Sequence, residues 1–194
     1  PTKASRVITR GAFTGPSFLV ASARTVTVTG STSFGLAVID SPLNTTRTSV
    51  GVILQGGSSL TGNAVGIDVS GELAAALVQG STLSGNSLAA LAVDNGGKLD
   101  AGDCTSSNFT GLGSSTGGNT LTGYGFDNAS PFAIVNTNSS LQPAVYATGN
   151  LWGNGPTDDI ASLFSGNGGP NSAIFYNAAS GPSIITQPSG GSFC

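Results

Sequence analysis

The stretch "SSLTGNAVGIDVSG", Ser58 to Gly71, decides the fold, because the chain soon repeats it as "STLSGNSLAALAVDNGG", Ser81 to Gly97. Leu60 and Leu83 occupy the same place in the two copies. A β-sandwich has strands about every 8–12 residues but no reason to repeat one turn phrase at a longer fixed period. A parallel β-solenoid needs such a period, because each coil stacks on the last about 4.8 Å away. We therefore predict an all-β fold, a right-handed parallel β-helix (β-solenoid) with coils of about 23 residues.

The repeated phrase also predicts a structural ladder inside the stack. Leu60 and Leu83 are expected to stack in the interior, and Asn63 and Asn86, which recur at the same interval, at a corner. A stacked amide side chain can hydrogen-bond to its copies above and below, and Asn tolerates the left-handed backbone that such corners need.

Composition points the same way. Charged residues make up 8 % of the 194 residues, against roughly 25 % in ordinary globular domains, and there are 30 Gly. Stacked like charges repel, whereas stacked Ser, Thr and Asn hydrogen-bond to one another. The net charge of −3 argues against a nucleic-acid partner, and no apolar run is long enough to span a membrane.

The pattern changes towards both ends of the chain. We predict an N-terminal extension and first strand over residues 1–30, a parallel β-helix over 31–156, and a C-terminal cap or extension over 157–194. In the last part, "GPTDDIASLFSGNG" predicts a short helix with Thr157 as N-cap, Asp158 and Asp159 in its first turn, and Gly166 as its stop.

From Gly118 onward the sequence resembles the right-handed parallel β-helix proteins of the pectate-lyase-like superfold. The resemblance is carried by "GGNTLTGYGFDNASPFAIVNTNSS" and by "AVYATGNLWGNGP", Ala144 to Pro156. The resemblance implies that Trp152 caps the last coil against water; an ordinary core tryptophan is the alternative. Many members of this superfold degrade polysaccharides, so the resemblance also makes such an activity an expectation to weigh.

The residues do not favour an enzyme. Polygalacturonase-like members use several Asp with a His, and this chain has no His. Lyase-like members use a Ca²⁺-binding Asp cluster with a catalytic Arg or Lys, whereas Arg24, Arg47 and Lys98 are isolated in this sequence. We predict no catalytic residues, no metal site and no cofactor.

Three aspartates form an alternative to that expectation. Asp68 and Asp94 are separated by close to one coil spacing, and so are Asp40 and Asp68, so the three can line up on one face. A two-carboxylate glycosidase is then possible. The simpler interpretation is that each Asp ends a strand at a turn.

Two cysteines, Cys104 and Cys194, predict a disulfide that ties the C-terminus to the body; a buried free thiol with a frayed terminal one is the alternative. Four N-x-[ST] sequons mark possible glycosylation at Asn44, Asn108, Asn128 and Asn138, although this composition yields about as many by chance.

We therefore expect an extracellular or cell-surface structural or adhesive β-solenoid without catalytic activity. Its partners would be further copies, stacked head to tail into a fibre, or other surface proteins. The first alternative is a carbohydrate-binding or polysaccharide-degrading module, or the non-catalytic tail of one. The second is a fragment of a large autotransporter-like adhesin.

Overall fold

The computed structural model describes residues 18–40, 49–102, 108–138, 145–153, 158–166 and 174–176. Within them the secondary structure is almost entirely β, which confirms the predicted all-β class. The strands are β1 (Phe18–Arg24), β2 (Thr27–Thr29), β3 (Phe34–Ile39), β4 (Ser49–Gln55), β5 (Ser59–Thr61), β6 (Val65–Ser70), β7 (Ala74–Val78), β8 (Ala89–Asp94), β9 (Lys98–Asp100), β10 (Phe132–Asn136), β11 (Val145–Ala147), β12 (Phe164–Gly166) and β13 (Ile174–Tyr176).

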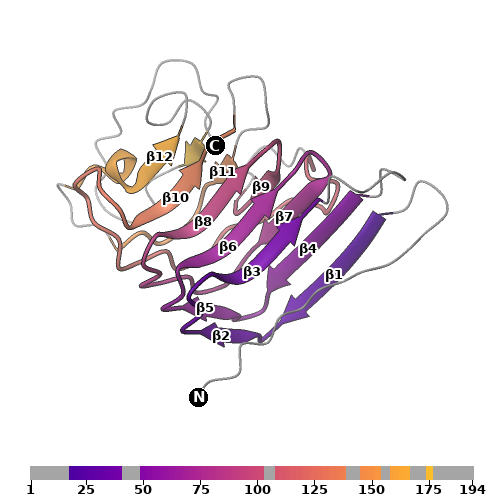
Figure 1. Ribbon diagram of the computed structural model, residues 1–194, viewed down its shortest axis with the longest axis horizontal. Coiled ribbons are helices and arrows are strands. Elements are labelled where there is room, and N and C mark those ends of the chain that lie inside the picture. Colours follow the sequence, from indigo (N-terminus) through magenta and orange to yellow (C-terminus); the bar gives the residue numbers. More distant parts are fainter. Residues whose placement is uncertain are drawn as a thin grey trace.

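The strands form three sheets, and every strand pairing in them is parallel. One sheet has six strands in the order β1-β4-β7-β9-β11-β13, and the second has five in the order β12-β10-β8-β6-β3. The third contains β2 and β5. Figure 1 shows the five-stranded sheet in front of the six-stranded one, with β2 and β5 below them.

The short third sheet is extended by single bridges. Ser59 of β5 bridges Thr82, Thr82 bridges Thr120, and Thr120 bridges Leu151, all in parallel. The chain therefore passes in rotation through the six-stranded sheet, this narrow face and the five-stranded sheet. We call one such passage a circuit; β1, β2 and β3 form the first, and β4, β5 and β6 the second.

Local sequence explains why a circuit turns where it does. In β5 the side chain of Leu60 is fully buried, while its neighbours Ser59 and Thr61 face outward and are partly exposed. Gly62 and Gly85 follow the equivalent positions of two circuits, with φ of 65° and 60°. Because this left-handed conformation is strained for residues with a Cβ, glycine allows the sharp bend into the next sheet.

The core is built from columns of equivalent side chains. One column lies on the inner side of the narrow face, and another lies on the inner side of the five-stranded sheet; in both, β-sheet register aligns each residue with the next. The buried members of these two columns are Leu60, Leu83, Leu121 and Trp152, and Ile67, Leu91, Ile134 and Phe164. Burial of such columns is the main favourable term in folding.

The circuits differ in length. Leu60 and Leu83 belong to successive circuits at the predicted spacing, and the backbone N–H of Leu60 donates to the carbonyl of Thr82. Ile67 of β6 pairs with Leu91 of β8, but its partner on the other side, in β3, is Leu36. The circuit between β3 and β6 is therefore the longer of the two. The predicted coil length holds for the two copies of the repeated phrase but not for every circuit.

The C-terminal segment corrects one prediction. In place of a helix that runs to Gly166, a 3₁₀ turn, η1, covers only Ile160–Leu163, and β12 follows it directly. Asp159 is its N-cap, since its Oδ1 accepts from the backbone N–H of Ala161 at 2.9 Å. Thr157, the predicted cap, lies outside the described residues.

The predicted boundaries at residues 30 and 156 remain predictions. The first segment contributes β1 and β2 to the same sheets as the body, and the last contributes β12 and β13. Cys104, Cys194, Asn44 and Arg47 lie outside the described residues. No helix of the described chain is long and apolar enough to cross a membrane.

Candidate functional site

Two columns of buried asparagines brace the corners of the narrow face. At the corner that leads to the five-stranded sheet, Asn86 Oδ1 accepts from the backbone N–H of Asn63 at 2.9 Å and from its Nδ2 at 3.2 Å. Asn86 Nδ2 donates to the carbonyl of Leu60 and to the hydroxyl of Tyr124. The Tyr124 hydroxyl donates onward to the carbonyl of Leu83, and burial raises the pKa of this phenol to about 12.

The opposite corner has a second column that the sequence did not reveal. Asn150 Oδ1 accepts from Asn119 Nδ2 at 2.9 Å and from its backbone N–H at 3.0 Å. Asn119 Oδ1 in turn accepts from the backbone N–H of Ser81 at 3.1 Å. These interior amides are structural, because their hydrogen-bonding groups are engaged by the protein itself.

Trp152 is 1 % exposed and continues the Leu60, Leu83 and Leu121 column. Its ring packs edge-on against Phe164 with centroids 5.3 Å apart, and Phe164 packs against Tyr176 at 4.8 Å. Trp152, Phe164 and Tyr176 therefore form a chain of three aromatic rings in contact.

The described sequon asparagines have unlike surroundings. Asn108 and Asn128 are exposed and adopt positive φ of 49° and 59°. Asn138 is buried, accepts from the backbone N–H of Gly96 at 2.8 Å and donates from Nδ2 to the carbonyl of Gly97 at 3.0 Å. Its amide is therefore inaccessible to a modifying enzyme once the chain has folded.

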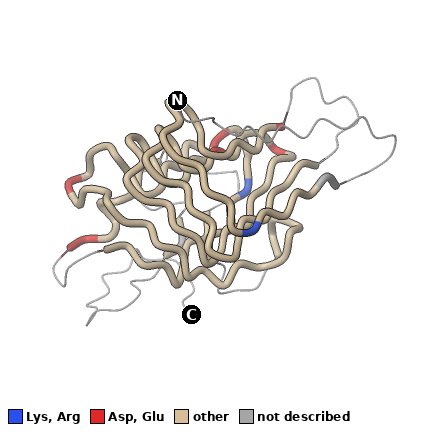
Figure 2. Tube along the Cα trace, turned by 90° about the horizontal axis from the view of Figure 1, so that it is seen from below, with Lys and Arg blue, Asp and Glu red and all other residues tan. Residues whose placement is uncertain are grey.

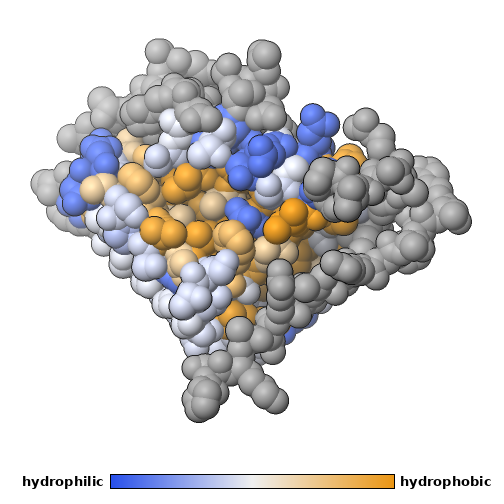
Figure 3. All heavy atoms as spheres, viewed as in Figure 1, coloured by the Kyte–Doolittle hydropathy of each residue, from blue (hydrophilic) through white to orange (hydrophobic). Residues whose placement is uncertain are grey.

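The outer side of the five-stranded sheet is the candidate functional site, and we call it the carboxylate face. Apolar side chains cover much of it, as the orange band in Figure 3 shows. Phe34 of β3 aligns with Val65, Ala89 and Phe132 of the next three strands. Phe34 and Ile39 are 40 % and 53 % exposed. An apolar patch with a few polar groups is a common form of ligand-binding surface.

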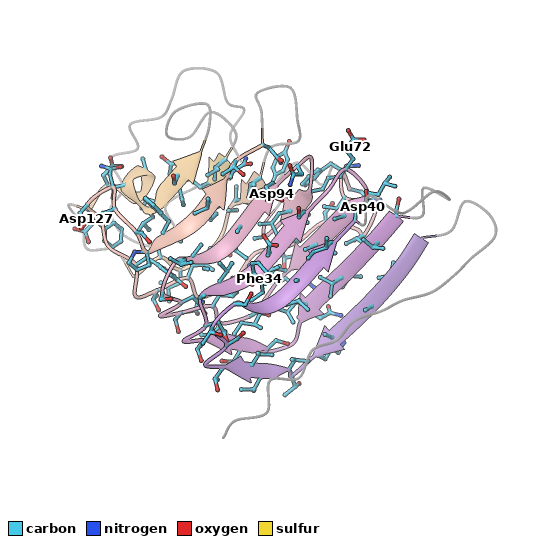
Figure 4. The ribbon with its side chains drawn as sticks, in the orientation of Figure 1. Phe34, Asp40, Glu72, Asp94 and Asp127 are labelled. Carbon is cyan, nitrogen blue, oxygen red and sulfur yellow. The ribbon has the colours of Figure 1, made fainter. Side chains whose placement is uncertain are left out.

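Two carboxylates stand in this apolar surrounding. Asp68 of β6 pairs with Ala92 of β8, and Ser70 pairs with Asp94, so the two aspartates are diagonal neighbours on one face. Sheet geometry places such neighbours about 7 Å apart. Figure 4 shows Asp94 at the upper end of the same sheet that carries Phe34.

Asp40, in contrast, does not join this pair. It follows β3, and its backbone N–H donates to the carbonyl of Ser70 at 2.8 Å, which places it beyond the level of Asp68. Ala37 is the partner of Asp68 in β3. The expected alignment of Asp40 with Asp68 is therefore wrong, because the circuit between β3 and β6 is longer than the interval that separates these two aspartates.

The carboxylate pair is electrostatically unusual. Burial among the apolar side chains, and then the charge of Asp94, raise the pKa of Asp68 from 3.8 to about 6. Asp94 Oδ1 is buried and has no hydrogen-bond partner in the described chain. Two carboxylates in unequal environments are the arrangement that acid–base chemistry on a glycosidic bond requires.

The two described basic residues lie on another sheet. Arg24 of β1 and Lys98 of β9, the two that lie in described segments, belong to the six-stranded sheet. No group of three or more metal-ligating side chains occurs in the described ranges. The carboxylate face thus offers acids and apolar surface but no described cation.

Comparison with known proteins assigns no relative: no family model, curated protein or solved structure matches the chain.

Sequence reasoning selected Asp68 and Asp94 but missed that Phe34 and Phe132 lie at the two ends of one row of the five-stranded sheet, with Val65 and Ala89 between them. Phe34 and Phe132 each begin a strand of the five-stranded sheet. A signal was present, since an aromatic residue stands at the first position of both strands, but the sequence does not say which face that position occupies.

Proposed function

We propose that the chain is a right-handed parallel β-helix that serves as a non-catalytic, extracellular structural or adhesive subunit, and that copies of it stack end to end into a surface fibre. The rotation of the chain through three parallel sheets supports the β-helix. The handedness follows the superfold that the sequence resembles, and nearly all parallel crossovers share it. Sparse charge and stacked polar side chains favour the extracellular setting.

The observation that carries the fibre is the open first circuit. β1, β2 and β3 each stand at the end of their sheet, so their outer backbone edges pair with no other described strand. Val28 and Leu36 occupy interior positions there but are only partly buried. The side chains at the equivalent positions of the next circuits, Leu60, Leu83, Ile67 and Leu91, are fully buried.

An end of this kind is matched by the other end of a second copy. Unpaired strand edges are templates for further strands, and a head-to-tail contact repeats without closing. The far end also presents strand edges, since β12 and β13 are the last described strands of their sheets. Stacking would pair both edges and cover Val28 and Leu36.

The proposal is tested by placing a charged side chain at the end formed by β1, β2 and β3. Leu36→Lys places an ammonium group in the contact, whereas Ile39→Lys in the same strand places it on the outer face, where Ile39 is 53 % exposed. We expect the unmodified chain and I39K to form concentration-dependent rods in sedimentation velocity and electron microscopy, and L36K to remain monomeric. Compact monomers of the unmodified chain at its highest soluble concentration would rule out the fibre.

A second candidate function, the binding or cleavage of a polysaccharide, is favoured by the carboxylate face. Asp68, with its raised pKa, would hold a proton under mildly acidic conditions and donate it to a leaving oxygen, while Asp94 would act as the base. Phe34 and Phe132 would line the sugar path beside them.

A depolymerisation screen at pH 5 to 6 tests the catalytic form of this candidate. Release of reducing ends that is lost in both D68N and D94N, but kept in D127N, would establish it. If the unmodified chain cleaves none of a broad polysaccharide panel, the pair has no glycosidase role.

The predicted disulfide and glycosylation belong to the same extracellular proposal. A thiol titration of the unfolded, unreduced protein is expected to find no free sulfhydryl from Cys104 and Cys194. Intact mass of protein secreted by a glycosylating cell measures how many sequons carry a glycan. Among the three sequon asparagines that the structure describes, Asn138 is the buried one.

A further inference from the structure

The narrow face carries two columns of hydroxyl side chains, and we call it the hydroxyl face. Its sequence signal is a polar–apolar–polar triplet that recurs in successive circuits as "TVT", "SLT", "TLS" and "TLT". The middle residue of each triplet points into the core, and the outer two face outward. The columns are Thr27, Ser59, Thr82 and Thr120, and Thr29, Thr61, Ser84 and Thr122.

These eight hydroxyls have no intramolecular hydrogen bond to any described residue. The serines just outside the columns behave differently: Ser58 Oγ donates to the carbonyl of Gln55 at 2.9 Å, and Ser81 Oγ donates to that of Gln79 at 3.0 Å. Each free hydroxyl is both a donor and an acceptor. The hydroxyl face is therefore a set of unused hydrogen-bonding groups in register.

The face is held rigid along both of its long edges. The Asn63–Asn86 column fixes one corner, and the Asn119–Asn150 column fixes the other. Glycines lie along the rims, and a Cβ at Gly62, Gly85, Gly80 or Gly118 would meet no atom within 4 Å. No rim side chain therefore rises above the hydroxyls at those positions, and the face from Thr27 to Thr120 is open to a flat ligand and preorganised for it; the next position of that column is Leu151, which is 47 % exposed.

The hydroxyls repeat in two dimensions. Neighbouring circuits lie about 4.8 Å apart, and the two columns, at positions i and i+2 of a strand, about 6.7 Å apart. None of the eight positions is charged or aromatic. Figure 2, seen from below, shows the successive circuits side by side and how few charged residues the described tube carries.

We propose that the hydroxyl face binds ice. Its ligand must repeat in two dimensions, carry no charge and offer donors and acceptors throughout, and crystalline water meets all three conditions. The threonine methyl groups between the hydroxyls favour the loss of liquid water from the contact. A charged polymer would find no counter-charge on the columns, and a sugar chain would find no aromatic ring there to stack on.

The inference is independent of the proposed fibre and of the carboxylate face. It uses a third surface, and a monomer is sufficient for it. Stacking would lengthen the array and strengthen the contact through added sites, but it is not required.

Retention of the full chain in slowly growing ice tests the proposal, with inhibition of ice recrystallisation as the second measurement. We expect the unmodified chain to be retained and Thr82→Tyr to lose about tenfold or more, because one protruding ring prevents the neighbouring hydroxyls from engaging together. Ser87→Tyr is the matched control, because Ser87 is an exposed turn residue beyond the rim, and it is expected to be retained like the unmodified chain.

Thr82→Val removes one hydroxyl and keeps the shape of the side chain, so it serves if the tyrosine variant fails to fold. It is expected to lower retention about threefold. Far-UV circular dichroism and the thermal midpoint establish that each variant is folded.

Three results would overturn the proposal. The first is exclusion of the unmodified chain from ice to the same degree as an unrelated soluble protein. The second is equal retention of T82Y and S87Y. The third is a T82Y-sensitive contact of another kind without ice retention, either binding to crystalline cellulose or chitin, or a dimer seen by sedimentation.

Discussion

The buried asparagines and the surface aspartates of this protein arise from the same geometry but have opposite energetic effects. Asn63 and Asn86 are equivalent residues of successive circuits, and the acceptor of one faces the donors of the next. Asp68 and Asp94 are also neighbours in successive strands, but each carries only acceptors when ionised, and burial together with the charge of Asp94 raises the pKa of Asp68.

The difference shows what parallel stacking does to a side chain. It places equivalent residues level with one another, so a group that is both donor and acceptor, such as the amide of Asn63 or Asn86, gains a partner in the next circuit. Asp68 and Asp94 are not level with each other, because their partners in register are Ala92 and Ser70, and the two acids meet only diagonally. Asparagine is therefore suited to the interior column, whereas the aspartate pair lies on the outer face, where both residues are partly exposed and water screens their charges in part.

The largest effect is expected from breaking the asparagine column in its middle. Asn86→Ala removes the acceptor of the Asn63 backbone N–H and the donors to Leu60 and Tyr124, all in buried surroundings. We expect a loss of about 3 kcal/mol or more in the free energy of unfolding, from unpaired polar groups plus a cavity. Urea unfolding measures it.

Ser87→Ala, next in sequence and exposed, is the control for that experiment and should change the unfolding free energy by less than about 0.5 kcal/mol. Equal losses in the two variants would mean that the column contributes nothing specific.

A smaller effect of opposite sign is expected from Asp68→Asn. Since the pKa of Asp68 is raised to about 6 in the folded chain, its ionisation opposes folding. The penalty is absent below pH 3.8, grows as the pH rises towards 6 and is complete above it. Because Asp68 is partly exposed, solvent screening reduces the penalty to about 1 kcal/mol.

Thermal or urea unfolding at pH 4 and pH 8 checks this prediction. D68N should be more stable than the unmodified chain at pH 8 and nearly equal to it at pH 4. Asp127→Asn, at an exposed turn, is the control and should show no such difference. A D68N variant that is less stable at pH 8 would show that the ionised carboxylate gains a favourable contact in the folded chain that outweighs its burial and the charge of Asp94.

The smallest effect is expected on the hydroxyl face. Thr82→Val should change the unfolding free energy by no more than about 0.5 kcal/mol, because the lost hydroxyl has no partner in the described chain. Differential scanning calorimetry is sensitive enough for this comparison. A loss near that of N86A would place the outer hydroxyls among the groups that hold the fold together.

Most of the regular part of the fold follows from local sequence. The repeated Leu–Ser/Thr–Gly–Asn phrase is followed each time by a strand of the five-stranded sheet, and the alternation around Leu60 and Leu83 identifies the inward positions. The predicted helix at Thr157 was wrong. Its residues have the composition of a first helical turn, but β12 follows η1 directly and pairs with β10, so β pairing ends the helical segment after one 3₁₀ turn.

The candidate site was predictable only in its residue types. Spacing identified Asp68 and Asp94 as neighbours, with an error of two residues in register, because Asp68 pairs with Ala92 instead of Asp94. It placed Asp40 wrongly, because the circuit from β3 to β6 is longer than the circuit from β6 to β8. The alignment of Phe34 with Phe132 and the raised pKa of Asp68 depend on which side chains lie around the pair, and a linear pattern does not encode that.

The sequence by itself determined the parallel, all-β organisation, because a recurring phrase and its glycines set inward and outward positions within each short segment. Only the tertiary structure decided which segments lie level with one another, because the connections between sheets vary in length and the register is set by packing. Tyr124 at the end of the Asn63–Asn86 column and Phe164 against Trp152 are products of that register. So is the alignment on one face of eight hydroxyls that have no hydrogen-bond partner in the described chain.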